Sequence, residues 1–118
     1  MRNVELFTNA DASTQLISEP VNLDQRAQWK LYIYSTGLDG TPRLFIEDNT
    51  SGSKCITPTG TWTEICNPFE DYNYFELSDT TVTIEKKDFK ANWFRIRIEP
   101  SGNTTGTIDV RLSYKTFP

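Results

Sequence analysis

The sequence predicts an all-β protein, a single antiparallel β-sandwich of jelly-roll or immunoglobulin-like type with about nine short strands. Apolar and polar residues alternate in two runs within Trp29–Asp48, and the same period of two recurs in Asn92–Ile98 and Thr105–Lys115. Successive side chains of a strand point to opposite faces, so this alternation is typical of strands with one buried face. Residues with turn chemistry separate the runs, and no segment of useful length has a helical period.

The same pattern gives the order of the elements along the chain. Two polar segments are expected not to be strands: Asn9–Thr14 is predicted to be a loop, and Lys86–Ala91 a single helical turn or a loop. The expected strands and extended segments are Asn3–Phe7, Gln15–Leu23 with a bend at Pro20, Ala27–Ser35, Pro42–Asp48, Lys54–Thr57, Thr61–Cys66, Asn73–Leu77, Thr80–Glu85, Asn92–Ile98 and Thr105–Lys115.

Two pairs of these strands are expected to form hairpins. In Trp29–Asp48 the strands flank a break that contains Gly37 and an Asp-Gly pair, which are residues suited to tight turns. The last two strands are expected to pair in the same way, which would bring Arg95 and Arg97 close to Asp109 on the solvent face.

Length and charge limit the classes of protein that fit. The 118 residues suit one domain, in which residues 26–118 form the sandwich and residues 1–25 form an extended segment that packs on it or on a neighbour. The net charge of −4 opposes nucleic acid as a main partner. The chain has neither an apolar stretch long enough to cross a membrane nor the apolar core of a signal peptide, so we expect synthesis in a cytoplasm.

Candidate catalytic chemistry is sparse. Histidine is absent, which removes the commonest general base and most zinc sites, and no phosphate-binding or nucleophile motif occurs. We therefore expect no enzyme activity, no cofactor and no metal. A small hydrolase with paired carboxylates would need acids on aromatic-rich segments, and the candidates are Glu47, Asp48, Glu64, Glu70, Asp71 and Glu76. A calcium site would combine Asp39 with Glu47-Asp48-Asn49 of a neighbouring loop, although we favour solvated acids there.

The two cysteines flank a predicted turn. A symmetric hairpin centred between Gly60 and Thr61 would place Cys55 opposite Cys66, within reach of a disulfide. A protein made in a reducing cytoplasm more often keeps two such cysteines as small apolar thiols, and we favour that interpretation.

Aromatic residues are the strongest functional signal. Trp29, Phe94 and Tyr114 fall on apolar faces and are expected in the core. Outward aromatic and arginine side chains suit a protein interface, a platform for stacking sugars, or a strand buried on both faces. The residues predicted for an interface are Tyr32, Tyr34, Phe45, Trp93, Arg95 and Arg97, and those for sugar stacking are Tyr32, Tyr34, Trp62 and Tyr72.

The order of turn and strand motifs resembles that of small β-sandwich proteins of bacteriophage virions, which serve as head auxiliary or decoration proteins and head-fibre subunits. The similarity spans residues 27–115, whereas the first 25 residues and the two cysteines have no counterpart in the pattern. The motifs that carry it are Thr36-Gly37, Asp39-Gly40-Thr41, Arg43–Glu47, the loop Asp48–Gly52, Thr61–Ile65, Asn92–Ile96 and Gly102–Thr107.

This resemblance implies a structural role. The chain would be an auxiliary or decoration protein of a phage capsid, located in the virion. The family pattern contains no catalytic residues, so the resemblance implies none in this chain. Its expected partners are the major capsid protein or other virion proteins, and copies of itself in a homo-oligomer. A tail or fibre subunit and a carbohydrate-binding module remain alternatives.

Overall fold

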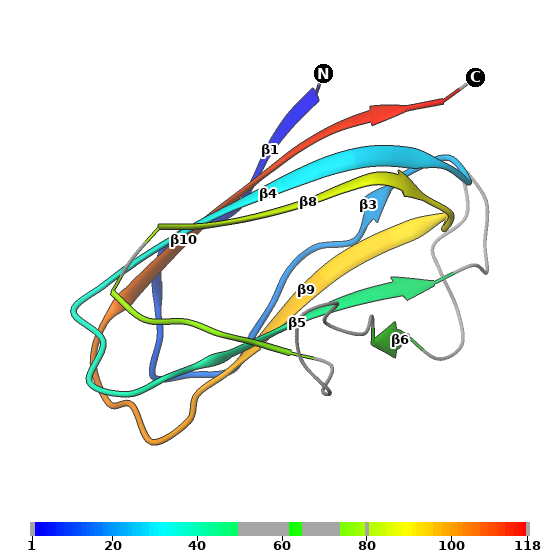
Figure 1. The fold of residues 1–118 in the computed structure, drawn as a ribbon. Coiled ribbons are helices and arrows are strands. Elements are labelled where there is room, and N and C mark those ends of the chain that lie inside the picture. Colours follow the sequence, from blue (N-terminus) through cyan, green and yellow to red (C-terminus); the bar gives the residue numbers. More distant parts are fainter. Residues whose placement is uncertain (1, 50–61, 65–73, 80, 118) are drawn as a thin grey trace.

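The computed structural model describes residues 2–49, 62–64, 74–79 and 81–117. These residues form strands and no helix, so the predicted all-β class is confirmed, and none of them belongs to a helix able to cross a membrane. The strands lie in two layers (Figure 1). They are β1 (Arg2–Asp11), β2 (Leu16–Ile17), β3 (Val21–Asn22), β4 (Ala27–Thr36), β5 (Arg43–Asn49), β6 (Thr63–Glu64), β7 (Phe75–Glu76), β8 (Thr81–Phe89), β9 (Trp93–Glu99) and β10 (Thr107–Thr116).

The two layers are antiparallel sheets. Sheet A has the order β1-β10-β4-β8. In sheet B, β9 and β5 form the centre, β2 and β3 both pair with β9, and β6 and β7 both pair with β5. The first 25 residues therefore supply one strand to sheet A and two short strands to sheet B.

The strand pairs are nested within one another. β1 pairs with β10, β2 and β3 with β9, β4 with β8, and β5 with β6 and β7. The chain crosses between the sheets after β1, β3, β4, β7, β8 and β9. This nested arrangement is a jelly roll and differs from an immunoglobulin-like order, in which several consecutive strands are neighbours in one sheet.

The two hairpins predicted within Trp29–Asp48 and Asn92–Lys115 are wrong, whereas the turn at Gly60 lies outside the described residues. β4 lies in sheet A and β5 in sheet B, and β9 and β10 are divided in the same way. Arg95 and Arg97 consequently pair with β5 residues, while Asp109 lies opposite Tyr34 of β4. A strand that buries one face against a second sheet has the same alternation as a strand in a hairpin, so the pattern does not identify its partner.

Two predicted loops, Asn9–Thr14 and Lys86–Ala91, are partly strand in the structure, and only their last residues lie outside β1 and β8. β1 continues to Asp11, and β8 continues through its polar residues to Phe89. β8 is held there by pairing with β4, and Phe89 packs into the core. The predicted extension of Gln15–Leu23 is confirmed, because β2 and β3 both pair with β9, and Pro20 lies in the break between them.

The core fills the space between the sheets and has an aromatic cluster. Trp29, Phe94 and Tyr114 are buried, as predicted. The Trp29 ring lies 5.1 Å from that of Phe94 and 5.6 Å from that of Phe89, in tilted and edge-to-face arrangements that aromatic pairs favour. Leu31 and Ile33 of sheet A face Leu44, Ile46, Ile96 and Ile98 of sheet B as further fully buried aliphatic residues.

Two crossing loops meet at one end of the sandwich. Asp39, in the β4–β5 loop, accepts hydrogen bonds from the backbone N–H groups of Thr104 and Thr105 in the β9–β10 loop. Gly40 allows this approach, since a Cβ there would lie 2.9 Å from the backbone N of Asn103. The buried Asn103 side chain donates from Nδ2 to the Ala12 carbonyl and accepts from the Ser101 N–H. Three segments distant in sequence are thus joined.

Candidate interaction surfaces

The six residues predicted to form one contact face lie on opposite faces of the sandwich. Tyr32 and Tyr34 of β4 point outward from sheet A, whereas the β5 and β9 residues point outward from sheet B. The expectation of one continuous face is therefore wrong, although all six residues lie outside the core. Alternation identifies outward positions but does not show which of the two sheets carries them. The sheet B residues are Phe45, Trp93, Arg95 and Arg97.

Arginines, aromatic rings and carboxylates alternate on the outer face of sheet B. The register sets opposite charges side by side, with Glu47 opposite Arg95 and Arg43 opposite Glu99. We call this surface the arginine–aromatic ladder, and it comprises Arg43, Phe45, Glu47, Trp62, Tyr74, Arg95, Arg97 and Glu99.

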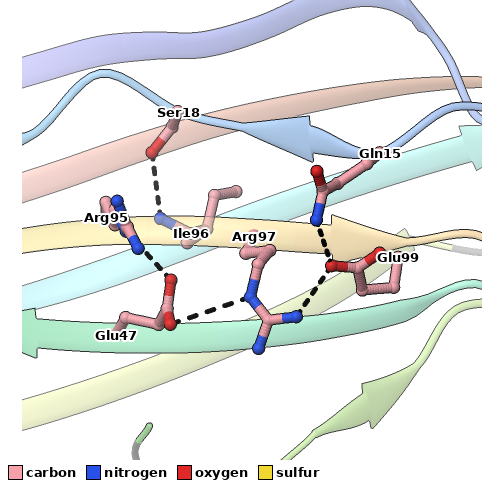
Figure 2. Close-up of polar contacts among 7 residues, drawn as sticks. All are labelled: Gln15, Ser18, Glu47, Arg95, Ile96, Arg97 and Glu99. Carbon is pink, nitrogen blue, oxygen red and sulfur yellow. Dashed lines mark hydrogen bonds and ion pairs between the residues drawn. The ribbon is translucent and has the colours of Figure 1, made fainter. Parts of the chain in front are cut away.

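Glu47 is the centre of the ladder (Figure 2). Its carboxylate accepts a hydrogen bond from Arg95 Nε at 2.9 Å, and its second oxygen lies 3.7 Å from Arg97 Nε. Only 5% of Glu47 is exposed, so solvent screens these ion pairs weakly. One carboxylate therefore fixes two neighbouring guanidinium groups on β9.

The network continues along β9 and into the segment before β2 (Figure 2). Arg97 Nη1 donates to Glu99 Oε1 at 2.7 Å, and Gln15 Nε2 donates to the same oxygen. The Gln15 hydrogen bond, followed by that from Arg97, holds the pKa of Glu99 below its ordinary value. Glu99 is therefore ionised at neutral pH and continues the alternation of charge.

The guanidinium groups of the ladder also stack on aromatic rings. Arg97 Cζ lies 4.1 Å from the Phe45 ring centroid, Arg95 Cζ 4.3 Å from that of Trp62, and Arg43 Cζ 4.5 Å from that of Tyr74. Each such contact contributes about 0.5–2 kcal/mol, depending on exposure. The arginines are thus held by a carboxylate or a ring before any partner binds.

Ser18 anchors the N-terminal segment to β9 between β2 and β3. Its backbone N–H donates to the Ile96 carbonyl at 2.9 Å. Its hydroxyl accepts from the Ile96 N–H, also at 2.9 Å (Figure 2). These two bonds replace the strand pairing that is interrupted near Pro20. β9 is therefore supported along one edge by β2–β3 and along the other by β5.

The outer face of sheet A carries a different set of side chains. Tyr32 has cations beside its ring, with Arg111 Cζ 4.7 Å and Lys30 Nζ 5.4 Å from the centroid. Tyr34, two residues along the same strand, is 53% exposed. Tyr32 lines two shallow hollows of about 240 and 260 Å³, and Tyr34 lines the first. This face combines an open ring with charged and hydroxyl groups.

The candidate acids do not converge in the part of the chain that the structure describes. Glu47 is paired with arginines, Asp48 lies opposite the buried Phe94, and Asp39 is bonded to the β9–β10 loop. Burial raises the pKa of Asp48. Among the described ranges, no group of three or more acids or cysteines could hold a metal ion. The predicted residues Cys55, Cys66, Glu70, Asp71 and Tyr72 lie outside the described residues.

Two members of the ladder and one residue bonded to it are not evident in the sequence. Arg43 and Tyr74 contact each other across 31 positions, and Gln15 bonds to Glu99 across 84 positions. Tyr74 also lies 5.7 Å, centroid to centroid, from Phe45. The available signal was the repeated Arg-x-Arg of β9 with aromatic residues nearby, but the register is needed to pair each arginine with its ring.

Comparison with known proteins gives no relative for this chain: no family model, curated protein or solved structure matches it. The functional argument therefore depends on the geometry of the two outer faces and on the motif resemblance. Of the two faces, the ladder has the larger number of fixed polar and aromatic groups.

Proposed function

We propose that this chain is a structural protein of a bacteriophage virion, an auxiliary or decoration protein of the capsid that acts through protein–protein contacts. The observation that carries the proposal is the arginine–aromatic ladder on the outer face of sheet B. The jelly roll, which is common in viral capsid and lectin domains, agrees with this role, as does the motif resemblance. We expect it to be made in the host cytoplasm and to reside in the virion.

The ladder has the composition of a protein interface. Arginine and aromatic residues are enriched in interfaces and account for most residues whose truncation weakens binding strongly. The side chains of Arg95 and Arg97 are 23% and 19% exposed, so their edges remain accessible to a partner. Because Glu47 and the rings already fix their geometry, little side-chain entropy is lost when a partner binds. The partner would be the major capsid protein, another virion protein or a second copy of this chain.

The test uses the double variant Trp93→Ala/Arg95→Ala. Particles are purified by density gradient from cells that make wild-type or variant protein, and quantitative mass spectrometry counts copies per particle. We expect wild type to be present in a fixed copy number and the variant to be depleted at least about tenfold, equivalent to about 1.4 kcal/mol of binding free energy. Light scattering of the purified protein gives the oligomeric state.

Two controls separate assembly from folding. Lys87→Ala changes an exposed residue of β8 in sheet A and should leave the copy number unchanged. Arg95→Lys retains the charge but loses the planar group that stacks on Trp62, so it should reproduce part of the defect without a cavity. Wild-type protein that is absent from particles and monomeric, or a folded double variant that assembles normally, would contradict the proposal.

The position of the protein in the particle distinguishes a decoration protein from a tail or fibre subunit. A capsid protein has a copy number that follows the number of capsid subunits, whereas a tail or fibre component is present in few copies at one site. Immunogold labelling of the same particles locates the chain directly. Both outcomes retain the contact role of the ladder, and only the first retains the decoration role.

A further inference from the structure

The outer face of sheet A has two adjoining hollows, and the proposed contact role does not involve them. Its first hollow, of about 240 Å³, is lined by the outward side chains Glu5, Tyr32, Tyr34, Thr81, Asp109 and Arg111, which come from four neighbouring strands. Asp109 and Thr81 lie directly opposite Tyr34 on the strands to either side. The open Tyr34 ring therefore stands between a carboxylate and a hydroxyl.

The side chains around this hollow are fixed by their neighbours. The Asn9 N–H donates to Asp109 Oδ1 at 3.0 Å, which orients that carboxylate. Arg111 is positioned over the Tyr32 ring at 4.7 Å, and Glu5 lies opposite Arg111 in the sheet register. These groups supply two carboxylate acceptors and one guanidinium donor around a space close to the size of one sugar ring.

A second hollow adjoins the first, because Tyr32 lines both. It has about 260 Å³ and is lined by Gln28, Trp29, Lys30, Tyr32, Glu85 and Lys86. Lys30 lies 5.4 Å from the Tyr32 ring, on the residue row next to that of Arg111. Two spaces of similar size, separated by one tyrosine, suit a ligand made of repeated units.

We propose that this face binds a neutral oligosaccharide of pyranose units, with one unit against Tyr34 in the first hollow and the next beyond Tyr32 in the second. Sugar hydroxyls both donate and accept hydrogen bonds, so they fit a hollow lined by carboxylates, a guanidinium and hydroxyls. The C–H face of a pyranose is apolar and packs on an exposed aromatic ring. The inference goes beyond the proposed function and uses the opposite face of the sandwich.

The charges of the two hollows together suit a neutral ligand. Glu5 and Asp109 face Arg111 in the first hollow, whereas Lys30 and Lys86 face Glu85 in the second, so the two hollows together have no net charge. A chain of phosphates or uronates would meet an excess of negative charge in the first hollow, and a neutral sugar would not. Both hollows are open to solvent and contact only one side of a ligand, so we expect dissociation constants near a millimolar.

The test is an NMR titration of ¹⁵N-labelled wild-type protein with cellotetraose, maltotetraose, mannotetraose and chitotetraose, and with tetragalacturonate as an anionic probe. We expect saturable shifts for at least one neutral tetrasaccharide, confined to β4, β8, β10 and the paired part of β1. Tyr34→Ala should weaken that binding at least about tenfold. Tyr34→Phe, which retains the ring, should bind within about twofold of wild type.

The controls distinguish this inference from the contact role of the ladder. Arg95 lies on sheet B, so the variant Arg95→Ala should keep the wild-type sugar affinity whether or not assembly is altered. No saturable shift with any neutral probe, shifts located on sheet B, binding of tetragalacturonate alone, or unchanged affinity in Tyr34→Ala would each overturn the inference. A wild-type dimer that Tyr34→Ala converts to a monomer would also overturn it, because a second copy would then cover this face.

Discussion

Asp39 accepts a 2.7 Å hydrogen bond from the backbone N–H of Thr104, which lies 65 residues further along the chain. The Thr104 hydroxyl and the Thr105 N–H donate to the same carboxylate. These bonds join the loop between β4 and β5 to the loop between β9 and β10, two of the places where the chain crosses between sheets. The carboxylate of Asp39 therefore connects the crossings.

The stability that the Asp39 hydrogen bonds contribute should be lost at acid pH. Its hydrogen bonds, the Thr104 hydroxyl first, lower its pKa from 3.8 to about 2. A lowered folded-state pKa adds stability above pH 3.8, and this stability is lost as the pH falls towards 2. Wild type should therefore melt at a higher temperature than Asp39→Asn at pH 5–7, and the difference should shrink below pH 3.8 and vanish only below the folded-state pKa of about 2. Glu19→Gln, at an exposed carboxylate, is the control; a difference independent of pH would contradict the assignment.

The contribution of Asp48 to stability should change with pH in the opposite direction. Burial raises its pKa above the ordinary value of 3.8, so the folded protein loses stability as the pH rises through the folded-state pKa. Asp48→Asn stays neutral and avoids that loss. We expect its melting temperature to exceed that of wild type at pH 7 and the two to converge near pH 3. Thermal unfolding followed by circular dichroism at several pH values measures this, and a less stable variant at neutral pH would refute it.

The buried side chain of Asn103 should matter for stability. Asn103→Ala removes the donor to the Ala12 carbonyl and the acceptor for the Ser101 N–H. Leaving such buried groups unpaired costs about 1–3 kcal/mol of unfolding free energy. Urea unfolding measures the loss. Asn103→Asp keeps an acceptor for Ser101 but not the donor, so its stability should also fall, and a wild-type value for both variants would exclude this role.

Glu47 and Glu99 should differ in their effects on stability. Glu47→Gln removes the charge between two arginines at a site that is 5% exposed, so we expect a loss of about 2 kcal/mol. The Glu99 side chain is 29% exposed, and its ion pair should be worth less than about 1 kcal/mol. Urea unfolding of Glu47→Gln and Glu99→Gln tests the order. Equal losses would indicate that burial does not strengthen the pairs of Glu47.

The sequence was sufficient for the class of fold and for the direction of most side chains. The alternation correctly predicts Trp29 and Phe94 in the core, and Tyr34 and Arg95 outside it, because the period of two is a local property of each strand. Strand partners were not predictable in this way. β4 and β5 read as a hairpin because each has one buried face, and that pattern is the same when the second strand lies across the core.

The contacts of the arginine–aromatic ladder are not predictable for the same reason, because they depend on which strands are partners. Arg97 stacks on Phe45 and pairs with Glu47 because β9 and β5 are neighbours in one particular register. A different pairing would have given those side chains other contacts. The extension of β8 to Phe89 also depends on β4, since its polar residues alone suggested a loop.

The pairing of β1 with β10 constrains how the protein can form. Asn9 and Asp109 are hydrogen-bonded although 100 residues separate them. During synthesis on the ribosome, β1 emerges long before the strand that completes its sheet. Closing so large a loop is entropically costly and slows folding. Nascent chains should therefore remain open to chaperones until β10 has been translated, and the sandwich should then close in a late, cooperative step.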